Sequence, residues 1–242
     1  SQGSYPEIWA IAKTCAERLM IDVPKVFVRN APNKMEIYSI SAENTSPVIV
    51  LTSGLCEKCT KDELSYLIGC ECGHIQNNHC IYYQAAPSFG IIMDSEVVNP
   101  VTDNRKQLAS VMMDWLTLSC VTADRAGIIC LDRPQDFSSV FVSLREKGLN
   151  DIYSRTGQVF DKDKAEKMYE TLHVTPARSI SLDSSTNYLE RRYFAGMEFL
   201  NCETLYSWRN DIGGDDLHTV NKQALEVRCE IILGSDSGKA GV

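Results

Sequence analysis

Apolar residues recur at helical spacing over residues 6–20, PEIWAIAKTCAERLM, and Pro6 stands where the first turn of a helix tolerates proline, which predicts an N-terminal helix. The pattern then changes to two runs rich in β-branched residues, KVFVRN and SPVIVLTS, separated by polar loops, which predicts a small sheet. Thr60, followed by Glu63 three positions later, forms a capping-box pattern. We therefore expect a further helix from Lys61 to about Cys80.

Helical patterns dominate the rest of the chain. Helices are predicted over residues 104–131, 135–148 and 161–173, and helical stretches alternate with loops beyond them. Residues 86–103 contain two prolines and a glycine and show no clear period, which is typical of a long loop on the substrate side of a site. These patterns predict a mostly helical α+β fold with a small N-terminal β-sheet.

The composition fits one acidic globular domain. The chain has 242 residues, of which 44% are hydrophobic, so it can bury the core of a single domain, expected over residues 5–233. Residues 1–4 are typical of an expression scar, and residues 234–242 of a frayed tail. The net charge of -8 argues against nucleic acid as a partner. The oligomeric state does not follow from these patterns.

The chain shows no membrane or export signal. No apolar run approaches the roughly 20 residues that a transmembrane helix needs, so we expect no membrane insertion. The ten cysteines follow no repeating pattern, and no basic stretch followed by an apolar one opens the chain. These observations favour the reducing cytoplasm over a disulfide-forming compartment.

The helix after Thr60 carries a candidate metal motif on its inner side. One apolar stripe along it consists of Leu64, Leu67, Ile68 and Ile75. Glu71 falls in the middle of this stripe, where a carboxylate without partners would cost several kcal/mol. Cys70 and His74 lie on consecutive turns beside it, at the four-residue spacing that lets two side chains share a metal. Cys72 points to the other side and is assigned to core packing.

Two segments together resemble a known family. The sequence TSGLCEKCTKDELSYLIGCECGHIQNNH, followed some 40 residues later by WLTLSCVTADRAGII, is similar to soluble members of the HtpX-like, CAAX-prenyl-protease-like zinc metallopeptidases, a gluzincin group. The resemblance implies a zincin-like domain with a cleft between the sheet and the helices. It also implies zinc as the cofactor and a peptide or protein substrate, bound extended along the strand near IYSIS.

Carried over by position, the family's metal ligands fall on Cys70, His74 and Cys120, and its general base falls on Glu71. Two ligands that are His and Glu in the family are thus cysteine here. Only 10 of the 242 residues are cysteine, so two chance replacements would rarely both give cysteine, and the change favours a re-tooled Cys/His/Cys site over a lost one. Zinc chemistry tolerates it, because thiolates are good zinc ligands. Two thiolates would cancel more of the zinc ion's charge than the family's ligands do, so a water bound to that zinc would be less acidic. They would also suit a softer metal such as Cu(I).

Three further positions carry implied roles. Asp124 falls where the family's aspartate accepts a hydrogen bond from the first zinc histidine, which is Cys70 here. Asp124 must therefore turn to Arg125 or to a backbone N–H, or else crowd the thiolate. His173 and Arg178 would line the cleft and stabilise the developing oxyanion, although a solvated surface pair fits them as well.

Two other features have weaker patterns. His79 either matches a family position or simply flanks the helix end, and CEKC at residues 56–59 would be half of a structural zinc site or a dithiol switch. The small residues of TADRAG have two equally good explanations, which are membership of the family motif and the close approach of two helices.

Three functions remain open at this stage. The leading hypothesis is a zinc-dependent, peptidase-like hydrolase in which Glu71 activates the attacking water. The second is a non-catalytic pseudo-peptidase that binds a peptide or a partner protein. The third is a redox or metal sensor, in which Cys70 and Cys120 approach closely enough to form a disulfide.

Overall fold

The computed structural model describes residues 5–42, 45–85, 103–149, 159–183, 185–213 and 220–234. The expected expression scar, most of the expected substrate-side loop and residues 235–242 of the expected tail lie outside these ranges. One hydrophobic cluster runs through the described part of the chain, from Ile8 near the start to Ile232 near the end. The mostly helical α+β class predicted from the sequence is confirmed.

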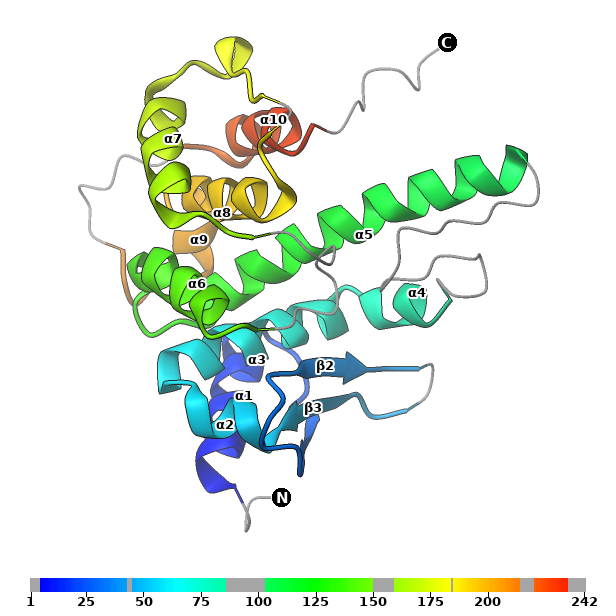
Figure 1. Ribbon diagram of the computed structural model, residues 1–242. Coiled ribbons are helices and arrows are strands. Elements are labelled where there is room, and N and C mark those ends of the chain that lie inside the picture. Colours follow the sequence, from blue (N-terminus) through cyan, green and yellow to red (C-terminus); the bar gives the residue numbers. More distant parts are fainter. Residues whose placement is uncertain are drawn as a thin grey trace.

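A three-stranded sheet lies at one side of the molecule (Figure 1). Its strands are β1 (Lys25–Arg29), β2 (Ile37–Ile40) and β3 (Val48–Thr52). β3 lies in the centre, parallel to β1 and antiparallel to β2. β2 therefore stands at an edge of the sheet, and it packs directly against the helix that carries the metal motif.

That helix, α3 (Lys61–Gln76), begins where the capping box predicted. The Thr60 hydroxyl accepts from the backbone N–H of Glu63 at 3.3 Å, and the Glu63 carboxylate accepts from the Thr60 N–H at 2.6 Å. The expected end at about Cys80 is wrong, because the helix stops at Gln76 and a new one, α4 (His79–Ala85), begins. Asn78 between them has a φ of 56°, a left-handed conformation that asparagine tolerates better than most residues.

The long helix α5 (Asp103–Cys130) is the main partner of α3. The two helices approach closely because glycines face each other across the contact. A Cβ on Gly69 would lie 2.6 Å from the Cβ of Cys130, and a Cβ on Gly127 would lie 2.6 Å from the Sγ of Cys70. The packing role of the small residues in TADRAG is therefore confirmed.

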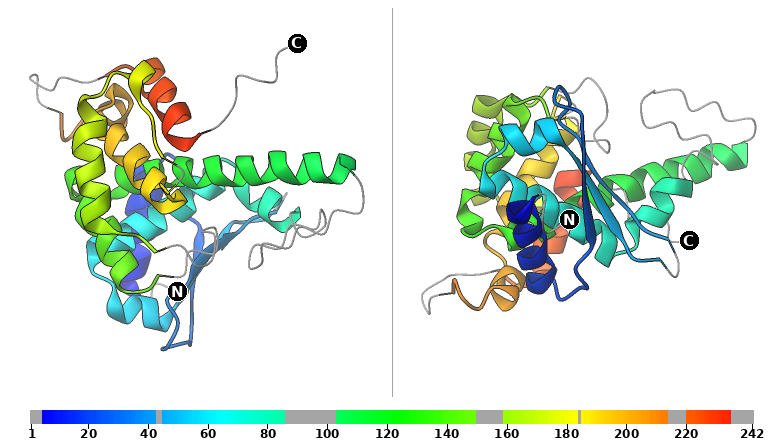
Figure 2. Two further views of the ribbon diagram at one scale, coloured as in Figure 1. Left: turned by 45° about the horizontal axis from the view of Figure 1, so that its top comes forward. Right: turned by 90° about the horizontal axis from the view of Figure 1, so that it is seen from below.

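The remaining helices enclose this pair. The N-terminal helix α1 (Pro6–Arg18) and the short α2 (Ser53–Lys58) lie on the side of the sheet (Figures 1 and 2). The later helices are α6 (Phe137–Glu146), α7 (Lys162–Val174), α8 (Tyr188–Phe199), α9 (Glu203–Trp208) and α10 (Lys222–Leu233). Of these, α6 packs against both α3 and α8, and α8 packs against α5. Short 3-10 turns precede α6 (Pro134–Asp136) and follow α7 (Ala177–Ser179). Within the described ranges, every helix is either too short or too polar to span a lipid bilayer.

Candidate functional site

A small cavity of about 30 Å³ lies where β2, α3, α5, α6 and α8 meet. A volume of this size holds about one water molecule. The residues of its lining that carry polar side-chain groups are Tyr66, Cys70, Glu71, His74, Arg145 and Arg192. The motif on α3 therefore does face an internal space, as the position of Glu71 in the apolar stripe predicted.

Glu71 and His74 are both buried, with 3% and 2% of their surface exposed. The Nδ1 atom of His74 lies 3.0 Å from the Nδ1 atom of His79, so that one ring donates a hydrogen bond and the other accepts it. Burial lowers the pKa of His79 to about 4, which keeps its ring neutral at neutral pH. His79 is thus a contact of the motif histidine and does more than flank the helix end.

Asp124 belongs to a buried ion pair with a residue far along the chain. Its carboxylate accepts from Nε and Nη2 of Arg192 at 2.8 and 2.7 Å, and from the Tyr66 hydroxyl at 2.7 Å. Arg192 and Asp124 are 5% and 1% exposed in their side chains. Arg125, the neighbour considered from the sequence, pairs instead with Glu226 at 2.9 Å.

The two candidate thiolate ligands meet different neighbours. Cys120 is 1% exposed, its Sγ lies 3.7 Å from the Tyr83 hydroxyl, and it also shares a hydrogen bond with the Tyr188 hydroxyl. Burial, reinforced by Cys120, raises the pKa of Tyr188. Cys70 lies instead against Gly127 on the face where α3 crosses α5, and it lines the cavity, whereas Cys120 does not.

No three His, Cys, Asp or Glu side chains in the described ranges, which include Cys70, His74 and Cys120, are grouped so that they could hold a metal ion together. The residues present therefore do not fit zinc in this geometry, and the Cys/His/Cys site stays a prediction. All ten cysteines are free thiols.

The expected oxyanion residues lie elsewhere. His173, on α7, has a side chain that is 50% exposed, with its Nδ1 at 3.3 Å from the Tyr169 hydroxyl and 3.9 Å from Oε1 of Glu198. Arg178 is exposed in the turn after α7, and neither residue lines the cavity.

Arg145 and Arg192 bring positive charge to the cavity instead, and sequence reasoning missed both. The signal for Arg192 was its place among apolar residues in YLERRYFAGMEF, where a buried arginine requires an anionic partner. Local pattern cannot name that partner, because Asp124 is 68 positions away.

Residues 5–145, more than half of the chain, match the family model described as Peptidase family M48. The chain belongs to peptidase family M48. The match covers the elements from α1 to α6, including the motif on α3 and the TADRAG segment on α5. The resemblance seen in the sequence is thereby confirmed at the level of the M48 family. Arg192, which binds Asp124, comes from α8 and lies beyond the matched residues.

Two curated M48-type relatives are similar over parts of their length. The plastoglobule-localized metallopeptidase 48, chloroplastic, of Arabidopsis thaliana is 24% identical over 154 residues, which cover 60% of this chain and 41% of the relative. A protease HtpX homolog of Pediococcus pentosaceus is 32% identical over 79 residues, or 32% of this chain and 26% of the relative. The chain thus spans less than half the length of either relative. No solved structure matches the chain.

Proposed function

We propose that this M48 chain is a pseudo-peptidase, which keeps the peptidase fold to bind an extended peptide and does not hydrolyse it with a bound zinc ion. The observation that carries the proposal is the ion pair between Asp124 and Arg192 beside the motif helix. In this ion pair, Arg192 binds the Asp124 carboxylate, which by the resemblance would instead accept a hydrogen bond from a metal ligand.

The fixed charges around the cavity support this proposal. Two carboxyl groups, Glu71 and Asp124, and two guanidinium groups, Arg145 and Arg192, surround the cavity, so their formal charges sum to zero. A divalent metal would add a charge of +2 to a buried, balanced site, which is costly without new anionic ligands. Cys70 and Cys120 would have to lose their protons and turn toward one point to supply them.

The edge strand β2 supports a binding role. Within the described residues it pairs with β3 alone, and its Ile37 side chain lines the cavity. An extended peptide can add to such an edge through backbone hydrogen bonds while one of its side chains reaches toward the site. The preserved motif helix would then act as the wall of a peptide groove.

The zinc hydrolase is the second candidate, because Glu71 and His74 both remain at the motif positions and both line the cavity. In that case Cys70, His74 and Cys120 would hold the metal, which would polarise the scissile carbonyl. Glu71 would take the proton of the attacking water. His173 and Arg178 would have to move to assist.

Metal content and Glu71-dependent cleavage separate the two candidates. We expect less than about 0.1 zinc per chain by elemental analysis after purification without added metal, against about one for a structural or catalytic site. We also expect that any cleavage of a fluorogenic peptide library by the unmodified chain persists in the Glu71→Gln variant, which means that no cleavage depends on Glu71. About one zinc per chain, lost in a Cys70→Ala/Cys120→Ala variant and kept in a Cys56→Ala/Cys59→Ala control, would overturn the proposal.

The binding role has its own test. Peptides selected from a displayed library should slow backbone hydrogen exchange in residues 37–40, because added strand hydrogen bonds protect the edge amides. Glu71→Gln should bind the selected peptides as the unmodified chain does. Protection confined to other segments would contradict binding at β2.

A further inference from the structure

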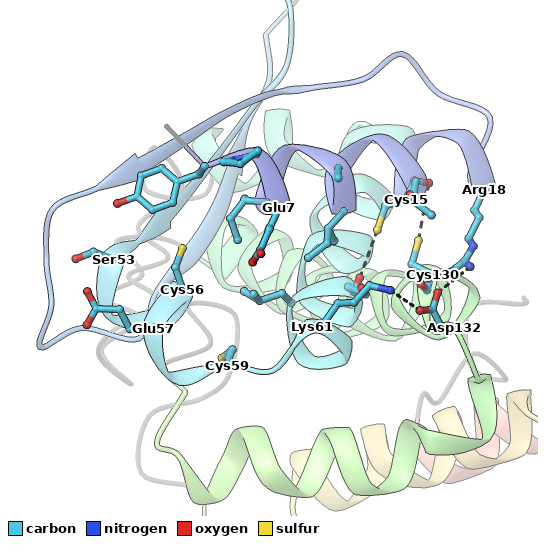
Figure 3. A pocket seen from close by; sticks show the side chains of 18 residues that line it. Glu7, Cys15, Arg18, Ser53, Cys56, Glu57, Cys59, Lys61, Cys130 and Asp132 are labelled. Atoms are coloured by element: carbon cyan, nitrogen blue, oxygen red, sulfur yellow. Dashed lines mark hydrogen bonds and ion pairs between the residues drawn. The ribbon is translucent and has the colours of Figure 1, made fainter. Parts of the chain in front are cut away.

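A second, much larger space lies between α1 and the corner formed by α2 and the start of α3 (Figure 3). Its volume of about 920 Å³ falls within the range of roughly 300–1,000 Å³ that small-molecule sites have. It shares no lining residue with the cavity around Glu71. We call this space the α1 groove.

The floor of the α1 groove is apolar. Ile8 and Ile11 of α1 and Leu64 of α3 form it, each with 5–7% of its surface exposed. Apolar side chains at the bottom of a concave site favour a ligand with an apolar chain, because burying that chain releases water from both surfaces.

The cations at one end of the α1 groove already have a partner. Arg18 donates to Oδ1 of Asp132 at 3.0 Å, and Lys61 donates to Oδ2 of the same carboxylate at 2.7 Å. Arg18 also donates to the carbonyl of Cys130. Asp132 thus neutralises one of the two positive charges at this end and holds both cations in place.

The remaining charged residues of the α1 groove are both acidic. Glu7 points into the groove from α1, and Glu57 stands at its rim on α2 (Figure 3). Both are exposed, and within the described ranges neither forms an ion pair. With Asp132 they bring three negative charges against the two positive charges of Arg18 and Lys61, so the lining carries a net charge of -1.

We propose that the α1 groove binds a small amphipathic cation, whose apolar chain lies on Ile8, Ile11 and Leu64 and whose ammonium group pairs with Glu7, with Glu57 adding attraction at the rim. The net charge of -1 separates this ligand from a fatty-acid-like anion, which would meet Glu7 and Glu57 while Arg18 and Lys61 are already engaged by Asp132. The α1 groove would serve such a ligand whether or not the M48 site binds a peptide.

Two thiols provide a built-in reporter of occupancy. Cys56 and Cys59 line the α1 groove and are half-buried, whereas Cys15 and Cys130, which also line it, are each 1% exposed. Burial raises the pKa of Cys59 to about 12 and also raises that of Cys56, so both react slowly enough for their rates to be followed. Cys70 is a half-buried thiol outside the groove and serves as the internal control.

The test compares octylammonium with octanoate, which share one chain length and differ in the sign of their charge. The full chain is treated at pH 8 with methyl methanethiosulfonate, and modification of each cysteine is followed by mass spectrometry. We expect saturating octylammonium to slow modification of Cys56 and Cys59 about fivefold or more and to leave Cys70 unchanged. Octanoate should change the rates less than twofold.

Matched variants assign the effect to the acidic residues. Glu7→Gln/Glu57→Gln should raise the octylammonium concentration for half-maximal protection by about three- to tenfold, as expected for two exposed charge pairs. Glu17→Gln removes the same charge from α1 outside the groove and should have no effect. Ala10→Trp should fill the groove and abolish protection. Equal protection by octanoate, unchanged affinity in the double variant, or no protection at all would overturn the proposal.

Discussion

Replacing Arg192 by methionine is the sharpest test of the ion pair beside the motif helix. The substitution keeps an unbranched side chain of similar length and removes the guanidinium group. It abolishes both hydrogen bonds to Asp124, at 2.8 and 2.7 Å, and leaves the carboxylate buried with the Tyr66 hydroxyl as its partner at 2.7 Å. We expect a large loss of stability, because a charge that has lost its counter-charge cannot reach water.

The magnitude follows from burial. Asp124 is 1% and Arg192 is 5% exposed, so little solvent screens the pair. Removing one partner of such a pair costs about 3–5 kcal/mol. The total free energy of unfolding of a domain is about 5–15 kcal/mol, so the variant should lose a large fraction of it. Removing the charge as well, in Asp124→Asn/Arg192→Met, should restore at least half of the loss, since an amide is cheaper to bury than a carboxylate.

Urea unfolding followed by circular dichroism measures these differences, with the denaturant slope checked for equality among variants. Arg133→Met is the matched control. Arg133 also forms two hydrogen bonds to one carboxylate, that of Asp136, at 2.9 and 2.6 Å, but its side chain is 76% exposed. The control should lose no more than about 1 kcal/mol.

Equal losses in Arg192→Met and Arg133→Met would refute the reasoning. The pair would then be exposed to solvent or absent in solution, and the charge balance argued for the cavity would fail with it. A double variant less stable than Arg192→Met would contradict the account in another way. It would show that Asp124 stabilises the fold through partners other than Arg192.

Three further predictions rest on single contacts. The folded-state pKa of His79, about 4, lies below the usual 6.5, so the stability that its neutral ring contributes is complete above pH 6.5 and is lost as the pH falls toward 4. A thermal-melting series over this pH range should show a loss of about 1–2 kcal/mol in the free energy of unfolding, and His79→Phe should remove that loss. The same pH dependence in His79→Phe as in the unmodified chain would contradict this prediction. Gly69→Ala should cost about 1–3 kcal/mol in urea unfolding, because the new Cβ meets Cys130 at 2.6 Å, whereas a Cβ on Gly213 meets nothing and Gly213→Ala should be neutral. Thr60→Ala should lower the free energy of unfolding by about 1 kcal/mol, since the first turn of α3 loses its cap. A decrease below about 0.3 kcal/mol would show that the cap is dispensable.

Local pattern accounts for much of the fold because its causes are local. The capping box places the start of α3, and the four-residue spacing places Cys70, Glu71 and His74 on the inner side of that helix. The end of α3 escaped prediction, because apolar residues continue past the break and the left-handed Asn78 has no strong pattern of its own.

The site depends on contacts that no local pattern specifies. Arg192 reaches Asp124 from 68 positions away, and the contact between His74 and His79 needs the sharp turn that starts α4. The α1 groove exists because α1 packs beside a corner formed some 40 residues later.

The amino-acid sequence alone determined the motif helix and the residues on its inner side, because helix capping and helical spacing act over three or four residues. The family followed from the sequence as well, through the likeness of two segments to known family members and the match to the M48 family model. Tertiary packing decided what those residues contact. It brought arginines rather than a converging set of ligands to the cavity, since the position of α8 against α5 depends on the whole core.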